Sequence, residues 1–291
     1  VDFAGTTFDT NVDYSQFCSA YREIVETPQP VAYDDAIVFK PTERLGYLWY
    51  FPRTSRRINV GLGFQMNKPP MKLVDVLKRD LEQRPEFEGA TVEDKLGAAL
   101  PTRRPYDSAV APGYLAVGDA AAHVNPTTGG GIPGAAKGGH WAAEVAVEAI
   151  SDGDVSEAAL WPYNEQVQTN FGKRFAAMDL YNIFGSAHEI DELTEVLAAL
   201  PGQMLIDLMG KKGTASLSFG EKVLTTITTA LQTRGHWGTL REAYKINKLA
   251  SRLKDIYGEY PDSPDGYEGW RAERDDLMDE VYDVTGAEPK Y

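Results

Sequence analysis

Residues 113–150 read GYLAVGDAAAHVNPTTGGGIPGAAKGGHWAAEVAVEAI, and this stretch predicts the central element of the fold. The short apolar run Tyr114–Val117 follows a Pro-Gly turn signal and predicts a buried strand. A loop with Pro126 and three successive glycines comes next, and from Ile132 onward small, helix-favouring residues with apolar spacing predict a helix. The stretch therefore predicts a strand, a glycine loop and a helix in succession.

A glycine loop that leads into a helix aims unpaired backbone N–H groups and the positive end of the helix dipole at a ligand that must come close. Residues 129–134, GGGIPG, formally fit the G-x-G-x-x-G phosphate-binding pattern, but in that pattern the glycines directly follow the strand. Here about ten residues separate Asp119 from Gly129, and the acidic residues Asp152 and Asp154 follow a helix rather than a second strand. We therefore exclude the dinucleotide-binding fingerprint.

The stretch resembles the second flavin-contacting motif of the flavoprotein group that contains aromatic hydroxylases and geranylgeranyl reductases. The resemblance rests on GDAA at 118–121, HVNP at 123–126 and GGGI at 129–132. It implies FAD as the cofactor, with Asp119 hydrogen bonded to the ribityl chain and backbone N–H groups around 130–132 facing the N1/C2 carbonyl edge of the flavin. The cofactor-binding residues that it implies are Gly118, Asp119, Pro126, Gly129, Gly130, Gly131 and Ile132.

The physical chemistry of the loop agrees with this assignment. A helix N-terminus stabilises an anion by roughly 0.3–2 kcal/mol, and a reduced flavin tends to carry negative charge at its N1/C2 edge. Taken alone, however, Asp119 is equally well a helix-cap or turn residue.

Three runs rich in β-branched and aromatic residues, 31–40, 45–52 and 57–65, predict an antiparallel meander because short turns connect them. In the middle run Tyr47, Trp49 and Phe51 alternate, so they share one face of the strand. Such an aromatic face is most often plain core, and it can also line a long apolar slot.

Two strings of this meander resemble motifs of geranylgeranyl reductases. GYLWYFP at 46–52 is similar to Y-x-W-x-F-P, and NVGLG at 59–63 is similar to the N-V-G-L-G that follows it. The resemblance implies that Tyr47, Trp49 and Phe51 line the cavity for the prenyl chain.

The remaining chain is predicted as mostly helical. Residues 16–26 predict a short helical or mixed stretch, and residues 74–83 predict a helix that ends before Pro85. Further helices are predicted over 161–178, 189–200, 220–232 and 237–257. The last thirty residues predict a short helix with tails. An apolar, methionine-containing set predicts an inter-helix core, with a lipid-facing lid as the alternative: Leu193, Val196, Leu197, Leu200, Met204, Leu205, Leu208 and Met209.

The predicted fold class is mixed α/β, corresponding to the C-terminal part of an FAD-dependent aromatic-hydroxylase-like fold. Residues 1–100 form a substrate-domain sheet with a helix, 101–155 the FAD-binding strand-loop-helix, and 156–291 a helical region. A motif that cradles the ADP half of FAD lies near the N-terminus in this group, and none is found in residues 1–112. We therefore expect an N-terminally incomplete chain that does not hold FAD fully by itself.

Composition restricts the class of partner. The chain of 291 residues has 43 acidic and 29 basic residues, a net charge of −14, which argues against a nucleic-acid surface. This excess predicts either a salt-loving source or an ordinary acidic cytosolic protein. Cys18 is the single cysteine, and neither a signal peptide nor a membrane-length apolar run is present. The predicted location is cytoplasmic, with peripheral membrane contact as an option.

The predicted function is FAD-dependent saturation of C=C bonds in geranylgeranyl or other prenyl chains of isoprenoid lipids. Ferredoxin or NAD(P)H is the expected electron donor, and the sequence names no catalytic residue or proton donor. His123, His140, His188 and His236 lack metal-ligand spacing, no G-x-S-x-G is present, and His123 is expected to be a buried structural residue. The alternatives are a flavin-dependent monooxygenase on the same scaffold and a non-catalytic protein that binds a lipid or a partner.

Overall fold

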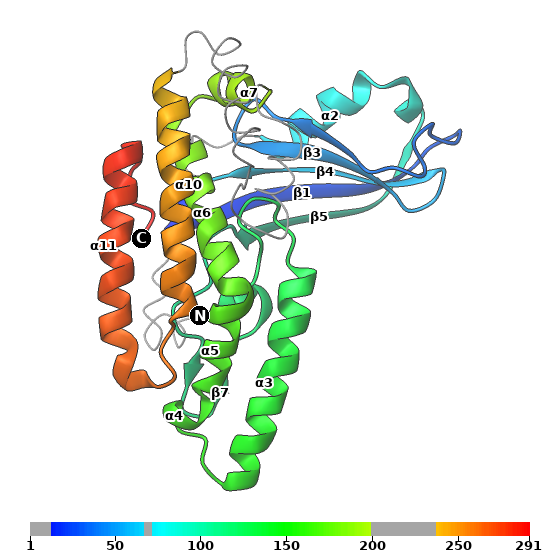
Figure 1. Ribbon diagram of the computed structural model, residues 1–291. Helices are drawn as coiled ribbons and strands as arrows, with labels where there is room; N and C mark the ends of the chain where they lie inside the picture. Colours follow the sequence, from blue (N-terminus) through cyan, green and yellow to red (C-terminus); the bar gives the residue numbers. More distant parts are fainter. Residues whose placement is uncertain (1–12, 67–71, 199–236) are drawn as a thin grey trace. The chain divides into compact units, whose positions relative to one another are not determined.

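The computed structural model describes residues 13–66, 72–198 and 237–291 (Figure 1). The chain divides into two compact units, one formed by Tyr14–Leu100 and the other containing Pro101–Tyr291. The helix predicted over 220–232 and the apolar residues Leu200, Met204, Leu205, Leu208 and Met209 lie outside the described residues.

The first unit is built on a five-stranded sheet with the strand order β2-β3-β4-β1-β5 (Figure 1). Strand β3 pairs antiparallel with β2 and with β4, and β4 pairs antiparallel with β1. The predicted meander is therefore confirmed. The strands are β1 (Phe17–Glu26), β2 (Val38–Pro41), β3 (Gly46–Pro52), β4 (Arg57–Gln65) and β5 (Thr91–Pro101).

Two predictions in this unit are wrong. The stretch 16–26 is strand β1 rather than helical or mixed, because it pairs with β4 from Cys18 opposite Gln65 to Glu26 opposite Arg57. This long-range pairing overrides a weak local pattern. The run predicted from residue 31 becomes a strand only at Val38, since turns around Asp34 and Asp35, a residue type disfavoured in strands, precede it.

The two faces of the sheet differ in their packing. Leu48, Tyr50, Val60 and Leu62 are buried in one cluster with Leu77 of helix α2 (Leu73–Glu82), which confirms the helix predicted there. A 3₁₀ turn η1 (Tyr14–Gln16) precedes β1, and η2 (Pro85–Phe87) follows α2. The opposite face carries the half-buried aromatic residues of β3.

Gly61 of β4 lies against this aromatic face, directly opposite Trp49. A Cβ atom at Gly61 would be 2.4 Å from Trp49 Cζ2 and 2.6 Å from the Tyr21 carbonyl oxygen. We therefore expect Gly61→Ala to lower the free energy of unfolding by about 1–3 kcal/mol, since overpacking displaces the indole ring or the neighbouring strand. Urea unfolding together with near-UV circular dichroism measures both effects.

Gly97→Ala in β5 is the matched control, because the nearest atom to its added Cβ is at an ordinary 3.7 Å. Its stability should change by no more than about 0.5 kcal/mol, as for surface substitutions elsewhere. If both variants lost the same free energy of unfolding, the close packing of Gly61 against Trp49 would not be the reason for glycine at this position.

The second unit begins with a short hairpin, β6 (Val110–Ala111) and β7 (Tyr114–Leu115), and the 3₁₀ turn η3 (Gly118–Ala121). Helix α3 (Ile132–Asp152) starts at Ile132 as predicted, whereas the predicted strand 114–117 shrinks to the two residues of β7. The following helical elements are α4 (Glu157–Leu160), α5 (Pro162–Val167), the π-turn η4 (Gln168–Gly172), α6 (Lys173–Ala187) and α7 (Ile190–Ala198). The last are α10 (Trp237–Gly258), η5 (Pro264–Gly266) and α11 (Tyr267–Thr285).

Helices α6 and α10 run side by side and share the core of this unit with α11 (Figure 1). Leu193 and Val196 are buried, as predicted for an inter-helix core. The prediction of a short terminal helix with tails is wrong, because α11 spans 19 residues and Lys290 beyond it is only 6% exposed. The buried Asp179 carboxylate of α6 accepts hydrogen bonds from Lys290 and Tyr291 and holds this tail in place, and the local sequence pattern does not report such a contact.

Candidate cofactor-binding site

The turn after β7 is held in an unusual backbone conformation. Gly118 has φ 62° and Ala122 has φ 55°, a left-handed value that a residue with a Cβ adopts at a cost of roughly 1–2 kcal/mol. Two hydrogen bonds close the turn: the His123 N–H donates to the Gly118 carbonyl at 2.9 Å, and the Gly118 N–H donates to His123 Nδ1 at 3.3 Å. Strain of this kind, held by its surroundings, is common at functional sites.

His123 fills the space between this turn and α3. Its side chain is 1% exposed, and its ring meets the edge of Phe171 at 5.0 Å. Burial lowers the pKa of His123 to about 4, so the ring is neutral near pH 7. Because Nδ1 accepts a hydrogen bond, Nε2 carries the proton, and it has no partner among the described residues. The ring is a buried structural histidine, as predicted.

The loop between His123 and α3 is organised by Asn125. Its side-chain oxygen accepts from the N–H groups of Thr127 at 3.0 Å and Thr128 at 3.3 Å. Its backbone N–H donates to the Gly130 carbonyl at 3.0 Å, and its carbonyl accepts from the Gly129 N–H at 2.9 Å. These four bonds hold residues 125–130 together as a compact turn. We call residues 125–131 the glycine loop.

The glycine loop leads directly into the N-terminus of α3, which begins at Ile132. Among the described residues no side chain caps α3, its first turn contains no acidic residue, and Ile132 is 85% exposed. Its first N–H groups are therefore available to a ligand, at the end of the helix that favours negative charge. Asp119 is exposed and lies beside this start, since a Cβ at Gly131 would be 3.3 Å from Asp119 Oδ1.

The arrangement offers a carboxylate acceptor for hydroxyl groups next to N–H donors for an electron-rich edge. Glycines at 129–131 keep the backbone bare, so a flat ligand can approach it. These residues fit the polar chain and the carbonyl edge of a flavin. The structure brings together Gly118, Asp119, Gly129, Gly130, Gly131 and Ile132 in one turn-loop-helix unit, whereas Pro126 is buried and turned toward α6.

The aromatic face of the other unit is continuous. Tyr47 contacts Trp49 with ring centroids 6.0 Å apart, and Trp49 stacks on Phe51 at the same separation. The Trp49 Nε1–H donates to Asn59 Oδ1 at 3.1 Å, which fixes the orientation of the indole. Phe39 of β2 adds its edge to both Tyr47 and Phe51 and is 54% exposed. Sequence reasoning missed Phe39, although its register opposite Trp49 follows from pairing β2 with β3.

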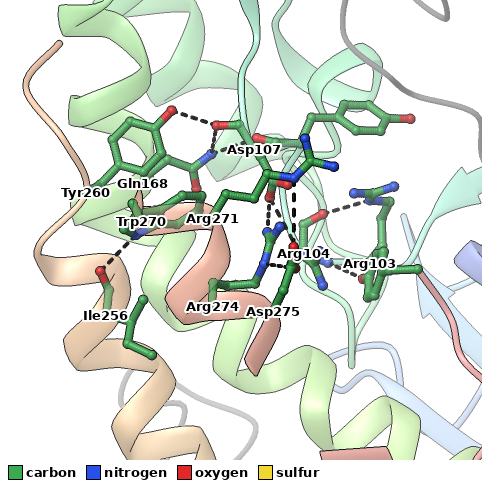
Figure 2. A network of polar contacts seen from close by, with 12 residues as sticks. Arg103, Arg104, Asp107, Gln168, Ile256, Tyr260, Trp270, Arg271, Arg274 and Asp275 are labelled. Carbon is green, nitrogen blue, oxygen red and sulfur yellow. Dashed lines mark hydrogen bonds and ion pairs between the residues drawn. The ribbon is translucent and has the colours of Figure 1, made fainter. Parts of the chain in front are cut away.

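A buried charge network supports the segment that leads to β6 (Figure 2). Asp107 accepts from Arg274 of α11 and lies 3.6 Å from Arg104 Nε, and both arginines are no more than 3% exposed. Arg274 also donates to Asp275 at 2.7 Å. Burial alone raises the pKa of Asp107, but the Arg274 and Arg104 guanidinium groups outweigh it and hold that pKa at about 2.

Sequence reasoning missed this network. The local signal is the pair Arg103-Arg104 with Asp107 three residues after Arg104, and nothing in the sequence links this segment to Arg274. No group of His, Cys, Asp or Glu able to hold a metal ion occurs within 13–66, 72–198 and 237–291. In the same ranges, none of the helices combines the length and the hydrophobicity of a membrane span.

Comparison with known proteins identifies the relatives of this chain. Residues 19–98 match the family model of the geranylgeranyl reductase catalytic domain. The digeranylgeranylglycerophospholipid reductase of Sulfolobus acidocaldarius is 28% identical over 267 residues, which are 90% of this chain and 58% of that protein. Digeranylgeranylglycerophospholipid reductase 2 of Methanopyrus kandleri is 34% identical over 198 residues, 66% of this chain and 49% of that protein.

A solved structure shares the fold. The geranylgeranyl bacteriochlorophyll reductase-like protein of Thermoplasma acidophilum superposes with a TM-score of 0.55 at 20% identity, over 97% of this chain and 58% of that one. The two units thus define a mixed α/β protein of the class predicted from the sequence. Within that class, the chain resembles the geranylgeranyl reductases, both in the catalytic-domain match over residues 19–98 and in the names of its curated relatives. It spans 58% and 49% of the lengths of the two curated relatives. The resemblance supports FAD as the cofactor, as predicted.

Proposed function

We propose that the protein is an FAD-dependent reductase that saturates C=C bonds in the geranylgeranyl chains of an isoprenoid lipid. The family match over residues 19–98 and the names of the curated relatives support this function. The observation that carries it is the bare, uncapped start of α3 beside the exposed Asp119 carboxylate. That combination suits a ligand with a polyol chain and an anionic ring edge.

Asp119 and the residues at the start of α3 would bind different parts of the cofactor. Asp119 would accept hydrogen bonds from the ribityl hydroxyl groups, and the N–H groups of Gly131 and Ile132 would donate to the N1/C2 edge of the ring. Reduced FAD, when bound, supplies the hydride for addition to a carbon–carbon double bond. The helix end favours the anionic form of the reduced ring and costs no reorganisation during the reaction.

Tyr47, Trp49, Phe51 and Phe39 would orient the prenyl chain. Their rings offer an apolar surface with defined tilts, and the hydrogen bond from Trp49 to Asn59 prevents the indole from rotating. An isolated alkene has no polar handle, so alignment of the chain is the main contribution that protein side chains can make.

Asp119→Ala in the protein expressed from its complete gene tests the residue assignment. We expect at least a tenfold rise in the dissociation constant for FAD, because a charged hydrogen-bond acceptor contributes about 1.5–3 kcal/mol. Flavin absorbance during titration of the apoprotein measures this change. Asp152→Ala, at the opposite end of α3, is the matched control and should bind FAD like the wild type. Full FAD affinity in the Asp119 variant would remove Asp119 from the site.

Product analysis tests the reaction itself. Incubation with a geranylgeranyl glycerophospholipid and either reduced ferredoxin or NAD(P)H should add two hydrogen atoms for each double bond, measured as a mass increase. Incorporation of an oxygen atom instead would identify a monooxygenase. If the purified protein is colourless and takes up the lipid while the mass of the lipid stays unchanged, the protein is a binding protein.

A further inference from the structure

Asn182 of α6 connects the glycine loop to a distant part of the same unit. Its side-chain nitrogen Nδ2 donates to the Pro126 carbonyl at 3.1 Å and to the Thr102 carbonyl at 3.2 Å. Asn182 is 8% exposed, and Pro126 and Thr102 are buried. Pro126 begins the turn that Asn125 organises, so this bond fixes the point where the loop leaves the protein interior.

The Thr102 carbonyl receives a second donor from the C-terminal tail. Lys290 Nζ donates to it at 2.7 Å and to Asp179 Oδ1 at 2.6 Å. Asp179 lies one turn before Asn182 on α6 and is completely buried. The Tyr291 hydroxyl donates to the other oxygen of Asp179 and accepts from the Arg104 N–H at 3.2 Å. The tail and α6 therefore hold the same backbone segment from two sides.

We propose that Asn182 is a positioning residue for the cofactor, acting through the Pro126 carbonyl, and that Lys290 stabilises its second acceptor. We call this arrangement the Asn182 bridge. It rests on the proposed function only in the identity of the ligand, since the bridge itself consists of contacts within the protein. Two carbonyls that share one buried amide group cannot move apart without leaving a buried polar group unpaired. The bridge thereby limits where the N–H groups at the start of α3 point.

Amide hydrogen exchange of the protein expressed from its complete gene, without added FAD, tests the bridge directly. Asn182→Asp keeps the shape of the side chain but removes both donated hydrogen bonds. The N–H groups of Asn125 and Gly129, which close the glycine loop, should then exchange about tenfold faster. Titration with FAD should show a dissociation constant raised by about tenfold in the same variant.

Asn164→Asp is the matched control. Asn164 is 1% exposed, lies on α5, and bonds Ser108 and Ala109 rather than the glycine loop. Its variant should leave exchange at Asn125 and Gly129, and the affinity for FAD, unchanged. Equal acceleration in both variants would overturn the bridge, because general destabilisation would then explain the effect.

Asn182→Ala separates the lost hydrogen bonds from the introduced charge and provides a second variant if the first does not fold. It must accelerate exchange in the same loop. If only the aspartate variant does so, a buried charge is responsible and the bridge is overturned. Faster loop exchange in variants of a protein whose wild type takes up no FAD would support the bridge while overturning the proposed cofactor.

Discussion

Asp107→Asn should lower the free energy of unfolding by about 3–5 kcal/mol, the usual cost of removing one partner from a buried ion pair. Arg274 and Arg104 are 2% and 3% exposed, so neither guanidinium group can turn to water when the carboxylate is lost. The substitution keeps the shape of the side chain and removes only its charge. Urea unfolding followed by far-UV circular dichroism measures the loss.

Asp275→Asn provides the comparison within the same network. Asp275 accepts from Arg274 Nε at 2.7 Å, but its side chain is 52% exposed. Water therefore screens this pair, and we expect a loss of about 1 kcal/mol or less. If the two variants lost the same stability, burial would not be the factor that makes Asp107 important.

The same ion pair predicts a pH dependence. The pKa of Asp107 is lowered from 3.8 to about 2 in the folded protein, so its contribution to stability is fully present above pH 3.8. That contribution is lost as the pH falls toward 2, because the unfolded chain binds the proton more readily. The wild type should therefore lose stability over this range more steeply than Asp107→Asn, which cannot titrate at this position. Parallel acid unfolding curves would contradict the assignment.

Gly134→Ala should lower the free energy of unfolding by about 1–3 kcal/mol, although alanine is normally the better helix former. A Cβ at Gly134 would lie 2.3 Å from the His123 carbonyl oxygen. That oxygen belongs to the strained turn closed by the hydrogen bonds between Gly118 and His123, so the backbone cannot yield without displacing the glycine loop. Thermal unfolding, together with FAD titration, measures both consequences.

Gly139→Ala on the same helix should have the opposite sign. In the described part of the chain, no atom outside the helix backbone and the adjoining residues lies within 4 Å of an added Cβ at Gly139, so the variant gains helix propensity without a clash. We expect its free energy of unfolding to rise by about 0.5–1 kcal/mol. Destabilisation of both variants by similar amounts would show that the close approach of α3 to His123 is not what requires glycine at 134.

The elements that the sequence predicts correctly are those with a strong local pattern. Strands β3 and β4 follow from dense β-branched and aromatic residues between turns, and α2, α3 and α10 follow from helical spacing. Strand β1 was missed because its residues alternate weakly and its identity comes from pairing with β4. The start of α3 at Ile132 was predictable because three glycines and a proline mark the boundary in the sequence itself.

The motif residues of the candidate site could be named from the sequence, but the residues of other elements that hold them in position could not. Asp119 and the glycine loop lie within one short stretch, so their proximity follows from local geometry. Asn182 and Arg274 come from two other elements, and each meets its partner from far along the chain. Phe39 meets Tyr47 only because β2 pairs with β3.

The sequence by itself determined the class of fold, and it predicted the resemblance to geranylgeranyl reductases and the stretch of chain that would face a cofactor, because these depend on residue types at short, fixed spacing. Only the tertiary structure decided that Lys290 and Tyr291 are buried against Asp179, and that Asn182 joins Pro126 to Thr102. The physical reason is that a buried charge or amide is stable only where partners surround it. The folding of α6 and α11 brings those partners together, and no local pattern records them.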